Sequence, residues 1–234
     1  ITSLEGHENE VKCAIWSISG RLIATCGRDK RVWIWEQLNH GEFECVTMLE
    51  GHTQDVKSLV WHPNEKVLFS ASYDNTIKVW VEESDDWYCS DTLKAHESTV
   101  WALSLSACGR KLASVSDDLS VKVWVCRGDV DEQNAWECCA ILKNAHMHPI
   151  YSVDWSHHHG HLVSAGGDNT MNVYHLEGND GYDMSIDKES GKAQAHDADI
   201  NCVKWNPDPA QTHAAHLLVS SGDDGKVHLW RFDG

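Results

Sequence analysis

The chain has 234 residues, of which 41% are hydrophobic, and its 36 acidic and 19 basic residues give a formal net charge of −17. A chain of this length can bury about 70% of the surface that its unfolded form exposes, so it can build a core without metals or disulfides. The negative charge would repel phosphate backbones and anionic headgroups, which argues against nucleic acid and membrane surfaces as primary ligands.

The sequence shows no membrane span and no secretory leader. No apolar run approaches the roughly 20 residues that a transmembrane helix needs, and no charged-then-apolar segment opens the chain. The nine cysteines are an odd number without the paired spacing of secreted proteins, which favours free thiols in a reducing compartment. We therefore predict a soluble cytoplasmic protein.

Five copies of one sequence unit make up the chain. Each copy opens on a small residue followed by histidine, and the copies recur every 44 to 50 residues. A period of this size is typical of solenoids and propellers. We predict a single domain over residues 1–234, with repeats at about 5–49, 50–93, 94–143, 144–193 and 194–234.

Each copy contains four short apolar segments separated by turns, which predicts four β-strands. In the first copy these segments are 11–16, 21–26, 31–35 and 44–49. The turns between second and third strands are rich in Asp, Asn and Gly, as tight hairpins require. Four-stranded units repeated in this way indicate an all-β fold, a β-propeller.

Two apolar positions recur in every copy and predict the packing between neighbouring blades. One lies four residues after each histidine and the other nine residues after it. The residues are Val11, Val56, Val100, Ile150 and Ile200 at the first position, and Trp16, Trp61, Leu105, Trp155 and Trp205 at the second.

Each copy also repeats a tetrad of histidine, hydroxyl residue, aspartate and aromatic residue. In four copies the last three follow the histidine by 18, 22 and 28 residues, and in the fifth an insertion near 208–216 lengthens each spacing by six. A hydrolytic triad would occur once, in an activated cleft, whereas this set recurs in register. We interpret it as a structural hydrogen-bond chain and predict that the protein is not an enzyme. The tetrads are His7, Thr25, Asp29, Trp35; His52, Ser70, Asp74, Trp80; His96, Ser114, Asp118, Trp124; His146, Ser164, Asp168, Tyr174; and His196, Ser220, Asp224, Trp230.

Residues 1–5 are predicted to form a strand, for which two interpretations stay open. The strand could be the outermost one of a preceding blade in a longer protein. It could instead complete the last blade, which otherwise ends with three strands. The absence of an initiating methionine favours the first interpretation.

The turn residue before each tetrad aspartate varies while its neighbours repeat: Arg28, Tyr73, Asp117, Gly167 and Asp223. Variation at a repeated position can encode the choice of partner, and Arg and aromatic residues are typical interface anchors. The alternative for these positions is solvent exposure or packing between blades. As candidate partner-binding residues, here called the rim residues, we select Arg28 and Tyr73 first, then Lys12, Lys57, Trp101 and Tyr151, which each lie five residues after a histidine.

We predict no cofactor and no physiological metal site. An iron-sulfur cluster needs converging thiolates, whereas Cys45, Cys89 and Cys139 occupy equivalent places on different blades. The run His157–His161 lies in a loop and could take up zinc or nickel adventitiously. The acidic stretches 82–86 and 129–132 are predicted to be solvated loops, with contact to a basic partner as the alternative.

Segments 4–12 and 24–35 resemble the third blade of the cytosolic iron-sulfur assembly WD-repeat family, and 52–57, 85–87, 95–101 and 199–207 continue the likeness. The resemblance implies a WD-repeat propeller of seven blades, of which the first two are absent here. It also implies a docking role in the late, targeting step of cytosolic and nuclear iron-sulfur protein maturation. The implied protein partners are a small adaptor, a large helical-repeat subunit, an iron-only-hydrogenase-like carrier and client apoproteins.

One binding residue of that family is carried over by position, the surface arginine of a Cys-Ser-Arg-Asp-Lys turn, which corresponds to Arg28. Gly27 replaces the serine here. Some members carry Leu-Tyr-Arg where this chain has Val79–Val81, so a partner that reads that motif is in doubt. The competing interpretation is an unrelated adaptor, such as a substrate receptor of a ubiquitin ligase. Such receptors carry Trp-Asp-x-Arg, and the nearest match, residues 124–127, lacks the acid.

Overall fold

The computed structural model describes residues 2–38, 41–156, 160–177, 185–192, 194–207 and 217–232, and these residues form nineteen β-strands and no α-helix. No helix in this described part is long and apolar enough to cross a bilayer. The expected insertion at 208–216 and three residues of the histidine run, 157–159, lie outside the described residues.

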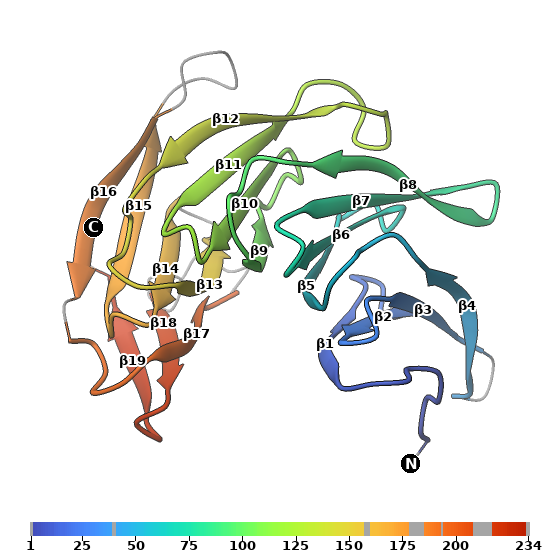
Figure 1. Ribbon diagram of the computed structural model, residues 1–234, viewed down its shortest axis with the longest axis horizontal. Helices are drawn as coiled ribbons and strands as arrows, with labels where there is room; N and C mark the ends of the chain where they lie inside the picture. Colours follow the sequence, from blue (N-terminus) through green and yellow to red (C-terminus); the bar gives the residue numbers. More distant parts are fainter. Residues whose placement is uncertain are drawn as a thin grey trace. The chain divides into compact units, whose positions relative to one another are not determined.

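The strands form five antiparallel sheets, and in each sheet the strands lie side by side in chain order (Figure 1). This meander follows from short connections, because a tight hairpin joins neighbouring antiparallel strands. The sheets are β1 (Val11–Trp16), β2 (Leu22–Gly27), β3 (Val32–Gln37) and β4 (Phe43–Leu49); β5 (Val56–Trp61), β6 (Val67–Ser72), β7 (Ile77–Glu83) and β8 (Asp86–Leu93); β9 (Val100–Leu105), β10 (Lys111–Ser116), β11 (Val121–Cys126) and β12 (Trp136–Leu142); β13 (Ile150–Trp155), β14 (Leu162–Gly166), β15 (Met171–Glu177) and β16 (Ser185–Lys192); and β17 (Ile200–Trp205), β18 (Leu217–Gly222) and β19 (Val227–Arg231).

The chain divides into two compact units. Residues 1–100 and 128–135 form the first unit, and residues 101–127 and 136–234 form the second. The first two sheets belong to the first unit, and the fourth and fifth sheets belong to the second.

The hairpins between second and third strands share one geometry. In each, the residue after the tetrad aspartate has a positive φ, and its backbone N–H bonds to the carbonyl three residues earlier. This is a turn that ends in the left-handed region, which Gly and Asn adopt at little cost. The residues are Lys30, Asn75, Leu119, Asn169 and Gly225, with φ between 61° and 73°.

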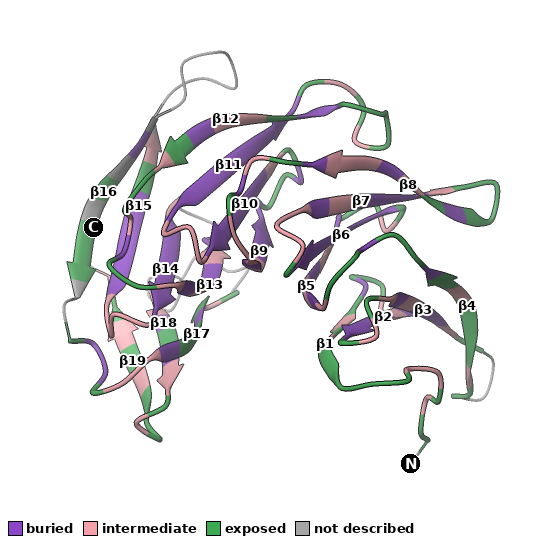
Figure 2. Ribbon diagram, in the orientation of Figure 1, coloured by how far each residue is buried: buried purple, intermediate pink, exposed green. Residues whose placement is uncertain are grey.

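A core lies within each unit. In the first unit Ile34, Val56 and Trp80 are almost fully buried and belong to one cluster formed by the first two sheets. In the second unit, separate clusters contain Val123 with Ile150 and Val163 with Ile200. The middle strands, such as β6 and β11, are buried along their whole length, whereas β4 is mostly exposed (Figure 2).

The predicted packing positions are buried in four repeats and exposed in the first. Their eight residues in the last four repeats are at most 7% exposed. Val11 and Trp16 are 48% and 57% exposed, so for them the prediction is wrong. A register shift between Val11 and Cys13 puts Val11 on the same face of β1 as Trp16, and Cys13 and Ile15 take the opposite face, which packs against the core.

Residues 2–5 form no strand in the described structure, and the fifth sheet has three described strands. A strand needs a neighbour to bond its backbone N–H and C=O groups, so both interpretations of this segment stay predictions.

Candidate functional site

The tetrad of the second sheet is a continuous hydrogen-bond chain. His52 Nδ1 lies 2.7 Å from a carboxylate oxygen of Asp74, and His52 Nε2 lies 2.7 Å from the hydroxyl of Ser70. The indole N–H of Trp80 donates to the same hydroxyl oxygen at 2.8 Å. An indole only donates and a carboxylate only accepts. Trp80 therefore donates at one end of the chain, and the Nδ1–H of His52 donates to Asp74 at the other.

The same contacts recur in other sheets. In the first sheet His7 bonds to Asp29 and Thr25 at 2.7 and 2.8 Å, and Trp35 donates to Thr25 at 2.9 Å. In the fourth sheet the phenol of Tyr174 replaces the indole. The contacts of the fourth sheet are His146–Ser164 at 2.7 Å, Ser164–Tyr174 at 2.8 Å and His146–Asp168 at 2.9 Å. Those of the fifth sheet are His196–Asp224 at 3.0 Å, His196–Ser220 at 2.8 Å and Trp230–Ser220 at 2.8 Å. In the third sheet Trp124 donates to Ser114 at 3.0 Å.

Each tetrad aspartate holds its hairpin and its histidine at once. One oxygen of Asp74 accepts from His52 and from the backbone N–H of Thr53 at 3.0 Å. The other accepts from the backbone N–H of Thr76 at 3.0 Å and from its hydroxyl at 2.6 Å. Burial alone would raise the pKa of Asp74, but the bonds from His52 and Thr76 outweigh it and hold the pKa well below its usual value.

This geometry leaves the tetrads unsuited to nucleophilic catalysis. The Ser70 hydroxyl is fully buried and already lies between His52 and Trp80. A nucleophile must reach a substrate in a cleft, which this hydroxyl cannot do. The tetrads join the loop before the first strand to the second and third strands of the sheet.

The rim residues of the first unit are three cations and one aromatic ring, and the Lys57 side chain is only 9% exposed and lies 3.9 Å from Asp55. Lys57 Nζ lies 3.9 Å from the centroid of the Tyr73 ring, within the range of a cation–π contact. Lys12 pairs with Glu10 at 2.7 Å. That hydrogen bond is the main cause of the lowered pKa of Glu10, and Arg28 and Lys57 lower it further. The positive charges of Lys12, Arg28 and Lys57 therefore all act on the carboxylate of Glu10.

The corresponding rim residues of the second unit are aromatic and surrounded by acids. The rings of Trp101 and Tyr151 meet edge to face at 5.2 Å, and the Trp101 indole donates to Asp117 at 2.5 Å. Burial raises the pKa of Tyr151, and the carboxylates of Asp199 and Asp117 raise it further. Asp199 was not identified from the sequence, because it belongs to the neighbouring repeat.

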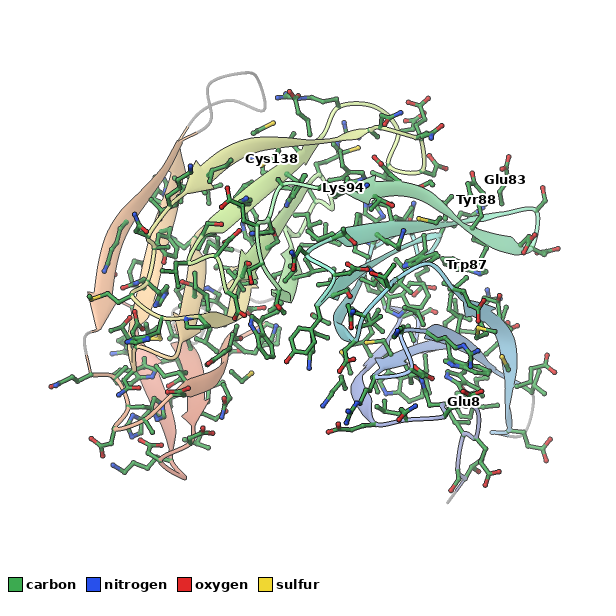
Figure 3. All side chains as sticks on the ribbon, in the orientation of Figure 1. Glu8, Glu83, Trp87, Tyr88, Lys94 and Cys138 are labelled. Carbon is green, nitrogen blue, oxygen red and sulfur yellow. The ribbon has the colours of Figure 1, made fainter. Side chains whose placement is uncertain are left out.

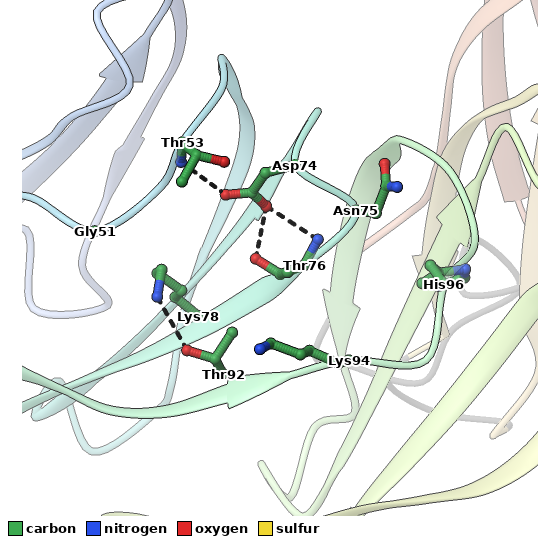
Figure 4. Close-up of a pocket in the computed structure, with 9 residues that line it drawn as sticks. All are labelled: Gly51, Thr53, Asp74, Asn75, Thr76, Lys78, Thr92, Lys94 and His96. Carbon is green, nitrogen blue, oxygen red and sulfur yellow. Dashed lines mark hydrogen bonds between the residues drawn. The ribbon is translucent and has the colours of Figure 1, made fainter.

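A cleft of about 490 Å³ in the first unit was also not anticipated from the sequence (Figure 4). Lys78 and Lys94 line it together with the hairpin of the second tetrad. Lys94 is exposed at the end of β8, where Figure 3 labels it. No repeat pattern marks these two lysines, since they lie in different strands and loops.

The described residues contain no group of three or more His, Cys, Asp or Glu side chains that could hold a metal ion. His161, the last histidine of the predicted run, contacts the rings of His175 and Phe232. In the acidic stretch 82–86, Glu83 accepts a hydrogen bond from the exposed phenol of Tyr88 (Figure 3).

Meandering four-stranded sheets that repeat a His–hydroxyl–aromatic chain define the WD-repeat class of β-propeller proteins. In agreement, the sequence model of the family "WD domain, G-beta repeat" matches residues 1–36, 43–81, 87–125, 136–175 and 188–231. The chain belongs to the WD-repeat family, and the predicted fold class is confirmed. The count of seven blades stays a prediction.

Three similar proteins from yeasts carry the same name. The chain is 48% identical over 235 residues to "Probable cytosolic iron-sulfur protein assembly protein 1" of Vanderwaltozyma polyspora, covering 98% of this chain and 66% of the relative. The proteins of that name from Candida dubliniensis and Candida glabrata are 46% and 45% identical, with 97% and 98% of this chain covered and 65% and 68% of the relatives. The resemblance noted from the sequence is confirmed. The chain spans just under two thirds of the length of the first two of these relatives.

Proposed function

We propose that this chain is part of a non-catalytic docking scaffold for cytosolic iron-sulfur protein assembly. The names of its relatives support the process. The tetrad geometry supports a scaffold, because the repeated polar residues are used up in holding each sheet together. The partners proposed are the small adaptor, the large helical-repeat subunit, the hydrogenase-like carrier and client apoproteins, in the cytosol and for nuclear clients in the nucleus.

We propose that partners bind the rim residues. The single observation that carries this is that equivalent positions of the repeat differ in chemistry. Five residues after the histidine, Lys12 and Lys57 are cationic in the first unit, whereas Trp101 and Tyr151 lie among carboxylates in the second. At the turn position, Arg28 of the first repeat is matched by Asp117 and Asp223 in later repeats. Equivalent sheets that carry different side chains at such positions can distinguish partners by charge and shape.

Arg28→Glu, made in the full-length protein, tests this proposal by affinity capture. The Arg28 side chain is exposed, so reversing its charge should leave the stability unchanged and reduce recovery of iron-sulfur assembly proteins. Arg21→Glu is the matched control, since Arg21 is also exposed but lies in the turn between β1 and β2.

Equal recovery by both variants would remove Arg28 from the binding surface. Failure of the wild-type protein to recover any iron-sulfur assembly protein would overturn the functional proposal. Residues 124–127 do not favour the ubiquitin-ligase alternative, because Arg127 is held at its own sheet by Glu137 at 2.9 Å and Cys139 at 3.0 Å.

A further inference from the structure

The cleft in the first unit is lined mainly by hydrogen-bond donors. Its walls come from the loop before β5, the hairpin between β6 and β7, and the ends of β7 and β8. Besides Asp74, the polar side chains include Thr53, Thr76, Thr92, Lys78 and Lys94. All these residues lie in the first two sheets or directly after them, within one compact unit.

Asp74 is the only acidic side chain in the wall, and it is already saturated. Its two oxygens accept four hydrogen bonds, from His52, Thr53 and twice from Thr76. This carboxylate is therefore held by its own sheet together with the Thr76 hydroxyl, and the donors left to meet a ligand are the ammonium groups of Lys78 and Lys94 and the hydroxyls of Thr53 and Thr92.

Both lysines line the cleft, and within the described residues neither pairs with a carboxylate. Lys78 Nζ donates to the hydroxyl of Thr92 at 3.0 Å, and its stem packs against Gly51. Figure 4 shows the Lys94 side chain pointing toward Thr92 and Lys78. Across the described ranges, neither lysine forms an ion pair with a carboxylate, although the chain has nearly twice as many acidic as basic residues.

We propose that this cleft binds the phosphoryl group of a phosphorylated serine or threonine in a partner protein. A phosphate monoester carries a charge of about −1.5 to −2 near neutral pH and only accepts hydrogen bonds apart from its residual proton, so it matches two ammonium groups and neighbouring hydroxyls. A carboxylate would balance only one of the two charges. The cleft is open to solvent and wider than a free anion needs, which suits a side chain presented by a peptide. This site is separate from the rim residues and does not depend on them.

Fluorescence anisotropy with the full chain and a labelled peptide tests the proposal. The probe is one phosphoserine flanked by glycines, and its comparison peptides carry serine or glutamate at that position. Lys94→Glu removes an exposed ammonium that holds nothing else in the described structure, and Lys78→Met removes the ammonium but keeps the stem over Gly51. Lys66→Glu is the control, because Lys66 is also exposed but lies outside the cleft.

We expect the phosphoserine peptide to bind and the other two peptides to bind at least about tenfold more weakly. Each lysine variant should weaken phosphopeptide binding by about tenfold or more, the size of one lost charge-assisted hydrogen bond, and Lys66→Glu should change it less than twofold. Equal binding of the glutamate peptide would overturn the phosphoryl assignment. An equal loss of phosphopeptide affinity in all three variants would show non-specific electrostatic attraction. Inorganic phosphate that binds as tightly as the peptide would show a site for free anions. Either outcome would also refute the proposal.

Discussion

Removal of the Asp74 carboxylate should destabilise the second sheet far more than removal of an exposed acid. In Asp74→Ala the Nδ1–H of His52 loses its acceptor, and His52 is only 6% exposed, so water cannot replace it freely. A hydrogen bond to a charged group contributes about 1.5–3 kcal/mol, and a buried donor left unsatisfied costs about 1–3 kcal/mol. The backbone N–H of Thr76 also loses its partner in the hairpin. We expect the free energy of unfolding to fall by about 3 kcal/mol.

Urea unfolding followed by tryptophan fluorescence measures this change, with the free energy extrapolated to water. Asp131→Ala is the control, because Asp131 is exposed and such substitutions usually change stability by less than about 0.5 kcal/mol. Asp74→Asn keeps one carbonyl acceptor and should fall between the two. If Asp74→Ala unfolds within about 0.5 kcal/mol of the control, the tetrad does not stabilise the sheet as argued.

Three further outcomes are expected. The pKa of Asp74 in the folded protein lies below the value of about 3.9 for an unfolded carboxyl. The contribution of Asp74 to the free energy of unfolding is therefore complete above about pH 3.9 and is lost as the pH falls toward the folded pKa. Urea midpoints measured from pH 6 to 3 should drop less for Asp74→Asn than for the wild type. Tyr174→Phe removes one hydrogen-bond partner of the buried Ser164 hydroxyl and should cost about 1 kcal/mol in the same unfolding assay. An unchanged midpoint would contradict the bond. Gly166→Ala places a methyl group against the backbone carbonyl of Pro149 and should lower the melting temperature, by overpacking worth about 1–3 kcal/mol.

The positions of the tetrads could be predicted because they depend on local chemistry. Aspartate in each hairpin accepts from the backbone two residues later, as Asp74 does from Thr76, and that preference belongs to the turn itself. The spacing from Ser70 to Trp80 follows from two strands joined by such a turn, and their side chains meet at 2.8 Å. Repetition over five copies made these local signals unambiguous.

The exposure of individual side chains could not be predicted in the same way. Val56 and Val11 occupy the same position in successive repeats, yet one is fully buried and the other is 48% exposed. Burial depends on which element covers a strand face, and the repeat pattern carries no information about that cover.

The sequence by itself determined the repeat, the strand and turn order, and the identity of the polar residues inside each sheet, because all of these arise from neighbours within about 30 residues of chain. Only the tertiary structure decided which side chains from different strands and repeats meet. It placed Tyr151 beside Trp101, fifty residues earlier in the chain, and directed Lys78 and Lys94 into one cleft. These contacts depend on how strands and sheets pack, and packing is set by the summed burial of many side chains rather than by any local motif.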